Sequence, residues 1–318
     1  MKKILLLGGT GFVGRHLCEK LVEAQCSVTV VTRRRANARH LLMLPVLEVV
    51  EADAYDSASL ARLLAGHDAV VNLVAILHGS ENAFEKAHVQ LPQALARACE
   101  TSGVRRLVHV SALGASLTSA SGYQRSKARG EAVLLSSGLD VSVLRPSVMF
   151  GSEDRFLNTF ASLQKFFPVI PLAGSGTRFQ PVWVEDVASA IVRCIEDRAT
   201  IGQTYEACGP DIFTLKQLVE MAGCYAGINH GEGRFVFGLP NVLARVQARL
   251  MELAPGEPVL SRDNLDSMKI DNIATGKLPG LEALGITPSS VAAIAPDYLG
   301  AQGLRSNLMD KRKTAGRF

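Results

Sequence analysis

The stretch Gly8-Gly9-Thr10-Gly11-Phe12-Val13-Gly14 decides the fold of this 318-residue chain. It follows the apolar run Lys3–Leu7 and opens a segment, Phe12–Ala24, whose apolar residues recur at helical spacing. In such a strand–turn–helix the first glycine permits a tight turn, the second admits a pyrophosphate, and the third lets the helix pack close to the strand. The helix N-terminus then attracts phosphate. The sequence therefore predicts a dinucleotide-binding loop that contains Gly8, Thr10, Gly11, Phe12 and Val13.

Strand-like and helix-like segments alternate through the first two hundred residues. Strands that are apolar on both faces belong in a parallel sheet covered by helices. The expected fold is a doubly wound α/β (Rossmann) domain over 1–150, to which 180–205 returns, with a smaller C-terminal substrate or partner region over most of 151–318. The expected strands are Lys3–Leu7, Ser27–Thr32, Leu47–Val50, Ala69–Leu77, Arg106–Ser111 and Val141–Leu144, and the expected helices Phe12–Ala24, Ser57–Leu64, Ala83–Ser102 and Gly122–Ser137.

The end of the second expected strand favours NADP(H) over NAD(H). A site that prefers NAD usually carries Asp or Glu there to accept from the ribose hydroxyls. Here Thr32 is followed by Arg33, Arg34 and Arg35, and a guanidinium can bind a 2′-phosphate bidentately. We expect Arg33 first and Arg34 second to hold that phosphate. The alternative is a solvated basic turn with no role in binding.

Two further strand ends belong to the expected cofactor site. Asp53, with Ala54 after it, follows the third strand. Its carboxylate either accepts from the adenine amino group or is an ordinary residue of a helix N-terminal turn. The fourth strand ends in the stretch Asn72-Leu73-Val74-Ala75, whose backbone is expected to run beneath the ribose and pyrophosphate.

Ser111, Tyr123 and Lys127 form a candidate catalytic set. Tyr123 and Lys127 lie one turn apart on an expected helix, and Ser111 ends the strand before it, at the edge where ligands bind. In the enzyme hypothesis Tyr123 is the general acid or base on a carbonyl or alcohol oxygen. Lys127 lowers the tyrosine pKa and holds the nicotinamide ribose, and Ser111 binds the substrate oxygen. The alternatives are cofactor binding without turnover and a surface pair without a function.

Together these motifs resemble the short-chain dehydrogenase/reductase superfamily, in its extended or atypical branch. The most specific match is Tyr123–Glu131, and Arg145-Pro146-Ser147 belongs to the same set. The segments Arg145–Ala161 and Gln180–Val187 are similar to the family of NADPH-binding accessory subunits of mitochondrial respiratory complex I and their bacterial relatives. This resemblance implies NADPH held by Arg33, Lys127 and the loop backbone, with Pro146 beside it.

Two main hypotheses of function follow from the resemblance. The first is an NADPH-dependent oxidoreductase that acts on a carbonyl, an alcohol or a quinone-related substrate, and the complete set of Ser111, Tyr123 and Lys127 favours it. The second is a non-catalytic NADPH-binding protein that supports complex I or quinone biosynthesis, which the segment Asp154–Asn158 favours. A third is a nucleotide-sensing regulator. The expected partners are a small, hydrophobic substrate and respiratory or quinone-biosynthesis proteins.

Composition excludes several other classes of protein. The 34 Lys and Arg residues face 30 Asp and Glu residues, a balance too mild for nucleic-acid binding. The spacing of Cys and His indicates no metal site, and the six cysteines lie mostly in apolar segments typical of buried thiols. The apolar runs fall short of the roughly 18 residues that a membrane span needs. We expect a cytoplasmic protein that is at most peripheral on the inner membrane.

Two features of the second region leave alternatives open. The segment Phe235–Leu253 is amphipathic, with Arg245 and Arg249 away from its apolar face. We favour packing of that face against its own domain, over capping a hydrophobic substrate or lying on a membrane surface. Trp183 is the only tryptophan and either lines a substrate pocket or packs in the core.

Overall fold

The computed structural model describes residues 1–253 and 258–300, and the chain forms two compact units. Unit 1 is assembled from three separate segments, and unit 2 takes the rest of the described chain. That residues 1–150, joined by 180–205, form a domain of their own stays a prediction. Unit 1 consists of Met1–Pro146, Val184–Ala207 and Ala274–Thr287, and unit 2 of Ser147–Trp183, Cys208–Ile273 and the described part of Pro288–Phe318.

Seven parallel strands form the sheet of unit 1, in the order β3-β2-β1-β4-β5-β6-β11. The order reverses between β1 and β4, and open α/β sheets bind ligands at the carboxyl ends of such a switch point. The predicted doubly wound fold is confirmed. The strands are β1 (Lys3–Leu7), β2 (Ser27–Thr32), β3 (Leu47–Glu51), β4 (Ala69–Asn72), β5 (Arg106–Val110), β6 (Asp140–Pro146) and β11 (Thr204–Ala207).

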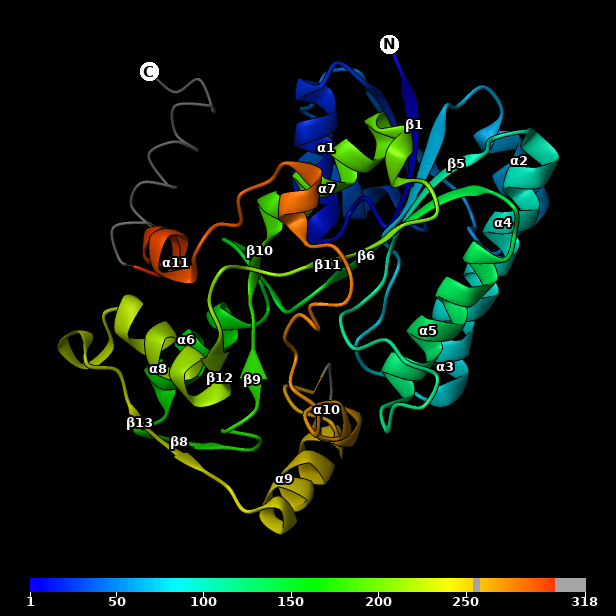
Figure 1. The fold of residues 1–318 in the computed structure, drawn as a ribbon. Helices are drawn as coiled ribbons and strands as arrows, with labels where there is room; N and C mark the ends of the chain where they lie inside the picture. The colour runs from blue at the N-terminus through cyan, green and yellow to red at the C-terminus, as the bar shows by residue number, and fades with distance from the viewer. Residues whose placement is uncertain (254–257, 301–318) are drawn as a thin grey trace, which may run out of the picture. The chain divides into compact units, whose positions relative to one another are not determined.

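Helices cover both faces of this sheet (Figure 1). The apolar sides of α2, α4 and α5 form one core with the strands, in which Leu5, Val70 and Leu107 are fully buried. On the other face α1 packs against α7. The helices of unit 1 are α1 (Phe12–Glu23), α2 (Ser57–Leu64), α3 (Glu81–Glu85), a π-helical turn (Lys86–Gln90), α4 (Leu91–Ser102), α5 (Gly122–Leu135) and α7 (Val184–Glu196), with 3-10 turns at Arg35–Leu41, Arg198–Thr200 and Leu281–Leu284.

The fourth strand is shorter than the predicted Ala69–Leu77, because side chains take over the backbone donors after Asn72. Oδ1 of Asn72 accepts from the backbone N–H of Val74 at 3.1 Å. The backbone N–H of Ile76 donates to Nε2 of His88 at 3.1 Å. The predicted helix Ala83–Ser102 begins at Glu81 instead and contains the π-helical turn. Both departures lie at the edge of the sheet where the cofactor is expected.

Unit 2 contains three two-stranded sheets with helices beside them. β7 pairs with β10 and β8 with β13 in parallel, whereas β9 and β12 are antiparallel. Phe150, Leu157 and Leu218 lie in its core, against which Trp183 packs. The elements are β7 (Met149–Phe150), α6 (Leu157–Phe166), β8 (Val169–Leu172), β9 (Arg178–Phe179), β10 (Val182–Trp183), β12 (Phe213–Thr214), α8 (Leu215–Tyr225), a 3-10 turn (Ile228–Gly231), β13 (Phe235–Gly238), α9 (Asn241–Leu253), α10 (Arg262–Ser267) and α11 (Val291–Leu299).

The amphipathic segment Phe235–Leu253 differs from the prediction in two respects. It is a strand followed by a helix, because its first residues pair with β8 and Pro240 separates β13 from α9. Val236 of β13 is buried, but the large apolar residues of α9 do not pack inward. Ala244 and Ala248 are the buried residues of α9, while Leu253 is 78% exposed. Among the described residues, helices long and apolar enough to cross a membrane are absent.

Candidate cofactor and catalytic site

The glycine-rich loop packs against the chain that leaves β4. Gly8 has a φ of +81°, and a Cβ there would lie 3.1 Å from the backbone of Leu73 and Val74. A Cβ on Gly14 would overlap the backbone of Gly9, so glycine allows α1 to approach the loop itself rather than the strand. By contrast, a Cβ on the exposed Gly11 would meet only the carbonyl oxygen of Gly8, at 3.4 Å. The space over Gly11 is therefore open to a ligand.

The N-terminus of α1 suits an anion. Gly11 is its N-cap residue, no side chain caps it, and its first turn contains no acidic residue. Thr10, Phe12 and Val13 beside it are partly exposed. Backbone N–H groups at such an end carry the positive pole of the helix dipole. The structure thus brings the five predicted loop residues around one end that fits a pyrophosphate.

Arg33 and Arg34 are exposed directly after β2. The turn is held by Thr32, whose Oγ1 donates to the carbonyl of Arg34 at 3.1 Å. The acidic residue Glu51, at the end of β3, lies near this turn. Its Oε2 is occupied by a hydrogen bond from the backbone N–H of Arg35 at 2.9 Å. Burial raises the pKa of the Tyr55 phenol, and the positive charge of the nearby Arg33 acts in the opposite direction. The charge of Arg33 therefore acts on a residue that follows β3.

The other predicted adenosine contacts lie at neighbouring strand ends. Asp53 is exposed, and its Oδ1 accepts from the backbone N–H of Tyr55 at 3.0 Å, as a turn residue does. Ala54 and Val74 pack partly against the core of unit 1. The remaining two residues of the stretch after β4 are the half-buried Leu73 and the exposed Ala75, and the buried Pro146 ends β6.

Lys127 is a charged side chain almost enclosed by protein, being 1% exposed. Its Nζ donates to the carbonyl of Val110, the last residue of β5, at 2.8 Å. Burial lowers the pKa of this amine to about 8, and the carboxylate of Glu131 opposes that shift. Glu131 is held in turn by Arg145, whose Nε donates to Oε1 at 3.0 Å. Enclosure therefore makes the charged form of this amine less stable than that of an exposed lysine.

Ser111 follows Val110 and is brought to the same strand end as Lys127. Its backbone N–H donates to the carbonyl of Leu144 at 2.7 Å. Its Oγ is buried and has no hydrogen-bond partner within the described part of the chain. A buried hydroxyl left in this state costs about 1–3 kcal/mol. The side chain of Ser111 is therefore ready to bind an oxygen atom of a ligand.

Tyr123 lies in the first turn of α5, one turn before Lys127. Its ring is half-buried and meets the imidazole of His88 edge-on, with centroids 5.5 Å apart. Phe84 packs on the same ring at 6.1 Å. Two of the three predicted catalytic residues thus share α5, and the third is adjacent to the carbonyl that Lys127 binds.

His88 is a site residue that the sequence argument missed. Because its Nε2 accepts from Ile76, its Nδ1 carries the proton and donates to Oγ of Ser126 at 2.8 Å. Burial and then the charge of Lys127 lower the pKa of His88 to about 3, so the imidazole is neutral. It ties the chain after β4 to α5. One sequence feature does point to this contact, namely a glycine, Gly130, inside the predicted helix. The structure gives its reason, because a Cβ there would overlap the carbonyl oxygen of His88.

His109 of β5 forms a second buried pair that the sequence argument missed. Its Nδ1 accepts from Nδ2 of Asn72 at 3.2 Å. Burial holds the pKa of His109 well below its ordinary value. Since Asn72 also binds Val74, this pair fixes the point at which the chain leaves β4.

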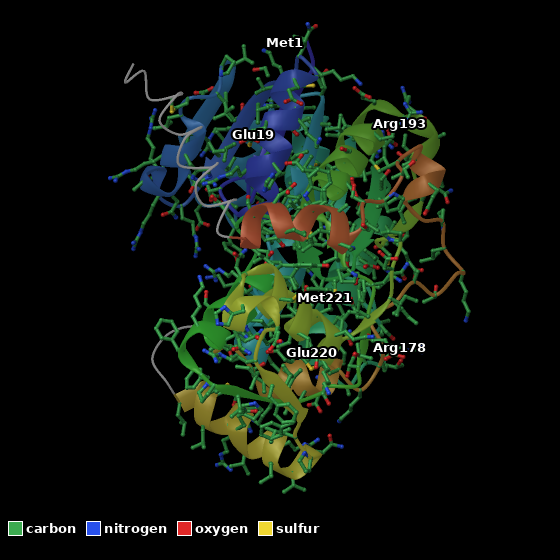
Figure 2. All side chains as sticks on the ribbon, turned by 90° about the vertical axis from the view of Figure 1, so that its left-hand side faces the viewer. Met1, Glu19, Arg178, Arg193, Glu220 and Met221 are labelled. Carbon is green, nitrogen blue, oxygen red and sulfur yellow. The ribbon has the colours of Figure 1, made fainter. Side chains whose placement is uncertain are left out.

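Two other clusters have structural explanations. In unit 2, Asp154 accepts from the backbone N–H of Phe156 at 2.8 Å and from the hydroxyl of Tyr298 at 2.8 Å, so the buried carboxylate of Asp154 holds the turn Asp154–Asn158. In unit 1, Glu19 of α1 (Figure 2) lies with His16 and Glu185 at distances that would suit a metal ion. There Glu185 is already bonded by His16 and by Nζ of Lys20 at 3.1 Å.

Comparisons with known proteins agree with this architecture. The family model described as NAD(P)H-binding matches residues 8–198. Over 292 residues the chain is 35% identical to the mitochondrial NADH dehydrogenase (ubiquinone) 1 alpha subcomplex subunit 9 of Mus musculus, covering 89% of this chain and 76% of that protein. A ceramide reductase of Caulobacter vibrioides is 28% identical over 190 residues, 59% of each chain.

Solved structures show the same fold. An NADPH-dependent quinone oxidoreductase of Escherichia coli, in complex with NADPH, superposes with a TM-score of 0.74 at 20% identity, over 93% of this chain and 99% of that one. A dTDP-glucose 4,6-dehydratase of Streptomyces venezuelae gives a TM-score of 0.71 at 23% identity, over 93% and 95%. At these identities the likeness concerns the fold alone.

Proposed function

The chain belongs to the NAD(P)H-binding family, and we propose that it is an NADPH-dependent oxidoreductase of the extended short-chain dehydrogenase/reductase type. One observation carries the proposal. The buried amine of Lys127, with its pKa lowered to about 8, binds the carbonyl next to Ser111, whose buried hydroxyl has no partner among the described residues. Unsatisfied polar groups and shifted pKa values of this kind gather at catalytic sites.

Residues of unit 1 would hold the cofactor. The loop of Gly8–Val13 would bind the pyrophosphate, and Arg33 and Arg34 the 2′-phosphate that distinguishes NADPH from NADH. Lys127 would bind the nicotinamide ribose. Bound NADPH would supply the hydride. The remaining contacts proposed are Asp53 and Ala54 at the adenine, Leu73, Val74 and Ala75 along the ribose and pyrophosphate, and Pro146 near the nicotinamide.

The proton would come from this chain. Tyr123 would donate its phenolic proton to the oxygen of a substrate carbonyl, while Oγ of Ser111 orients that oxygen. The positive charge of Lys127 would lower the pKa of Tyr123 and favour the tyrosinate that remains. The proposed substrates are carbonyl compounds, alcohols in the reverse direction, and quinone-related compounds.

The protein purified from cells provides the test. Any bound nucleotide is released and identified by mass, and its absorbance at the reduced-nicotinamide band is followed while quinones and small carbonyl compounds are added. We expect one class to oxidise NADPH. Tyr123→Phe should keep its affinity for NADPH and lose turnover by about 100-fold or more. Turnover that survives in this variant would exclude the proton role of Tyr123.

A second candidate function is a non-catalytic, NADPH-binding accessory protein of a respiratory assembly. The 35% identity to a subunit named for NADH dehydrogenase favours it, and respiratory proteins would then be its partners. Stoichiometric NADPH that stays reduced through the whole panel, together with unchanged behaviour of Tyr123→Phe, would support this function over the first.

A further inference from the structure

One end of unit 2 exposes an unusual amount of apolar surface. β8 and β13 pair so that Phe235 is opposite Val169 and Phe237 opposite Pro171. Their alternate residues, such as Val236, are buried, because successive side chains of a strand point to opposite faces. The outer face therefore presents aromatic side chains to solvent. Phe235 is 69% exposed, and its ring stacks on that of Phe237 with centroids 6.1 Å apart.

Further exposed apolar side chains lie in the elements that precede and follow this strand pair in the sequence. Phe166, at the end of α6, is 82% exposed and directly precedes Phe167 and β8. After β13 comes α9, and Figure 1 draws β8, β13 and α9 along the lower side of unit 2. We call this surface the apolar end. Its exposed residues are Phe166, Phe167, Val169, Phe235, Phe237, Val242, Leu243, Val246, Leu250 and Leu253.

Exposure on this scale requires an explanation. A single exposed leucine is ordinary, but large contiguous apolar patches on soluble proteins mark sites of interaction. All ten residues of the apolar end fall within two stretches of the sequence, 166–169 and 235–253. The buried side of α9 consists of Ala244 and Ala248. Its larger apolar side chains are exposed to solvent and are available to contact another surface.

The charges around the apolar end indicate what that other surface is. The stretches 165–171 and 234–253 contain four basic residues and a single acid, Glu252. Glu252 is neutralised by Arg262, whose Nε donates to it at 2.8 Å. Lys165 and Arg249 are exposed beside the apolar residues. Arg245 forms an ion pair with Asp266 of α10 at 3.7 Å, so the excess positive charge rests on Lys165, Arg234 and Arg249. Apolar side chains bordered by an excess of positive charge match the acyl boundary and head groups of an anionic bilayer.

We propose that the apolar end of unit 2 binds the surface of an anionic membrane. Phenylalanine and leucine side chains would enter the boundary between head groups and acyl chains, and Lys165 and Arg249 would contact phosphates. The helix α9, whose apolar residues lie opposite its alanine side, would lie in the plane of the interface. This inference is independent of the proposed enzyme function, because it uses only residues of unit 2.

Co-sedimentation of the full chain with vesicles tests the proposal. We expect binding to vesicles of equal parts phosphatidylcholine and phosphatidylglycerol, weaker binding to phosphatidylcholine alone, and release by high salt. The triple variant Phe166→Ser/Phe235→Ser/Leu250→Ser should bind at least about tenfold more weakly. A matched control, Met43→Ser, removes an apolar side chain that is equally exposed on unit 1 and should bind normally.

Several results would overturn the proposal. They are failure to bind either kind of vesicle, equal binding by the triple variant and Met43→Ser, and a dimer that the triple variant converts to a monomer in analytical ultracentrifugation. The last result would assign the apolar end to a second copy of the chain. The urea midpoint and NADPH affinity of each variant serve as the check on folding, since the substituted side chains are exposed. Vesicle binding and NADPH oxidation are separate measurements, so either can fail alone.

Discussion

Lys127 shows how strongly the properties of one residue depend on its surroundings. A YxxxK pair on a surface helix has ordinary pKa values, whereas here the amine is enclosed and hydrogen-bonded to the carbonyl of Val110. Enclosure disfavours the charged form, and the carboxylate of Glu131 compensates only in part. The sequence predicts the pair and its place after β5. It does not reveal the burial, because that depends on how α5 packs in the folded protein, where Lys127 contacts the end of β5.

The lowered pKa of Lys127 predicts a pH dependence of stability. Its pKa is about 8 when folded and 10.5 when unfolded, so between these values the unfolded chain binds more protons and stability rises with pH. This rise is worth about 3 kcal/mol for such a shift. Lys127→Met should lack it. Urea unfolding of both proteins at pH 7 and near pH 10 measures the difference, and parallel pH profiles would contradict the assignment.

Arg33 and Arg34 predict the choice of cofactor. Arg33→Ala with Arg34→Ala should weaken NADPH binding by roughly 10- to 100-fold and NADH binding little, because only NADPH carries the 2′-phosphate. Titration of both nucleotides by fluorescence gives the ratio. Arg35→Ala is the control, since the bond of that residue to Glu51 uses its backbone N–H. An equal loss for the two nucleotides would remove the 2′-phosphate role.

At the scale of secondary structure, predictions succeeded where the pattern was local. The strand Ser27–Thr32 and the helix Ser57–Leu64 have the predicted bounds, because apolar periodicity and turn residues define them. β4 was predicted too long, since the N–H of Ile76 is bound by His88 and not by a strand. His88 itself was missed for the same reason. Its partners come from the chain after β4 and from α5, which periodicity cannot relate.

The close contact between α5 and the π-helical turn predicts a sensitive glycine. Gly130→Ala would place a methyl group against the carbonyl oxygen of His88 and force α5 away from it. We expect a loss of about 1–3 kcal/mol in the free energy of unfolding and weaker NADPH binding. Gly176→Ala is the control, because a Cβ there meets open space. A variant as stable as the control would show that α5 can shift without cost.

At the scale of the whole molecule, the discontinuity of unit 1 limits what a fragment can do. Arg106 of β5 donates from Nη2 to the hydroxyl of Thr200 at 2.9 Å and also to the carbonyl of Cys194. α7 covers the face of the sheet on which α1 lies, where Leu17 and Leu21 are fully buried. The return of 180–205 was predicted from a strand-to-helix pattern. The third segment of unit 1, Ala274–Thr287, was not predicted, because it contains little regular structure.

A fragment of residues 1–150 should therefore not fold cooperatively. It would expose the apolar face of α1 that α7 covers, and Arg106 would lose its acceptors on Cys194 and Thr200. We expect a broad urea transition by circular dichroism and aggregation at micromolar concentration, compared with a sharp transition for the full chain. A fragment that unfolds sharply and binds NADPH would establish 1–150 as a complete domain.

The place of β11 at the edge of the sheet has a consequence for synthesis on the ribosome. β6 is complete when residue 146 has been made, but its outer edge stays unpaired until Thr204–Ala207 emerges much later. An open strand edge is a template for wrong pairing with other chains. During translation the nascent nucleotide-binding sheet thus carries an unprotected border while more than fifty residues are added. A chaperone that shields this border should increase the yield of native protein.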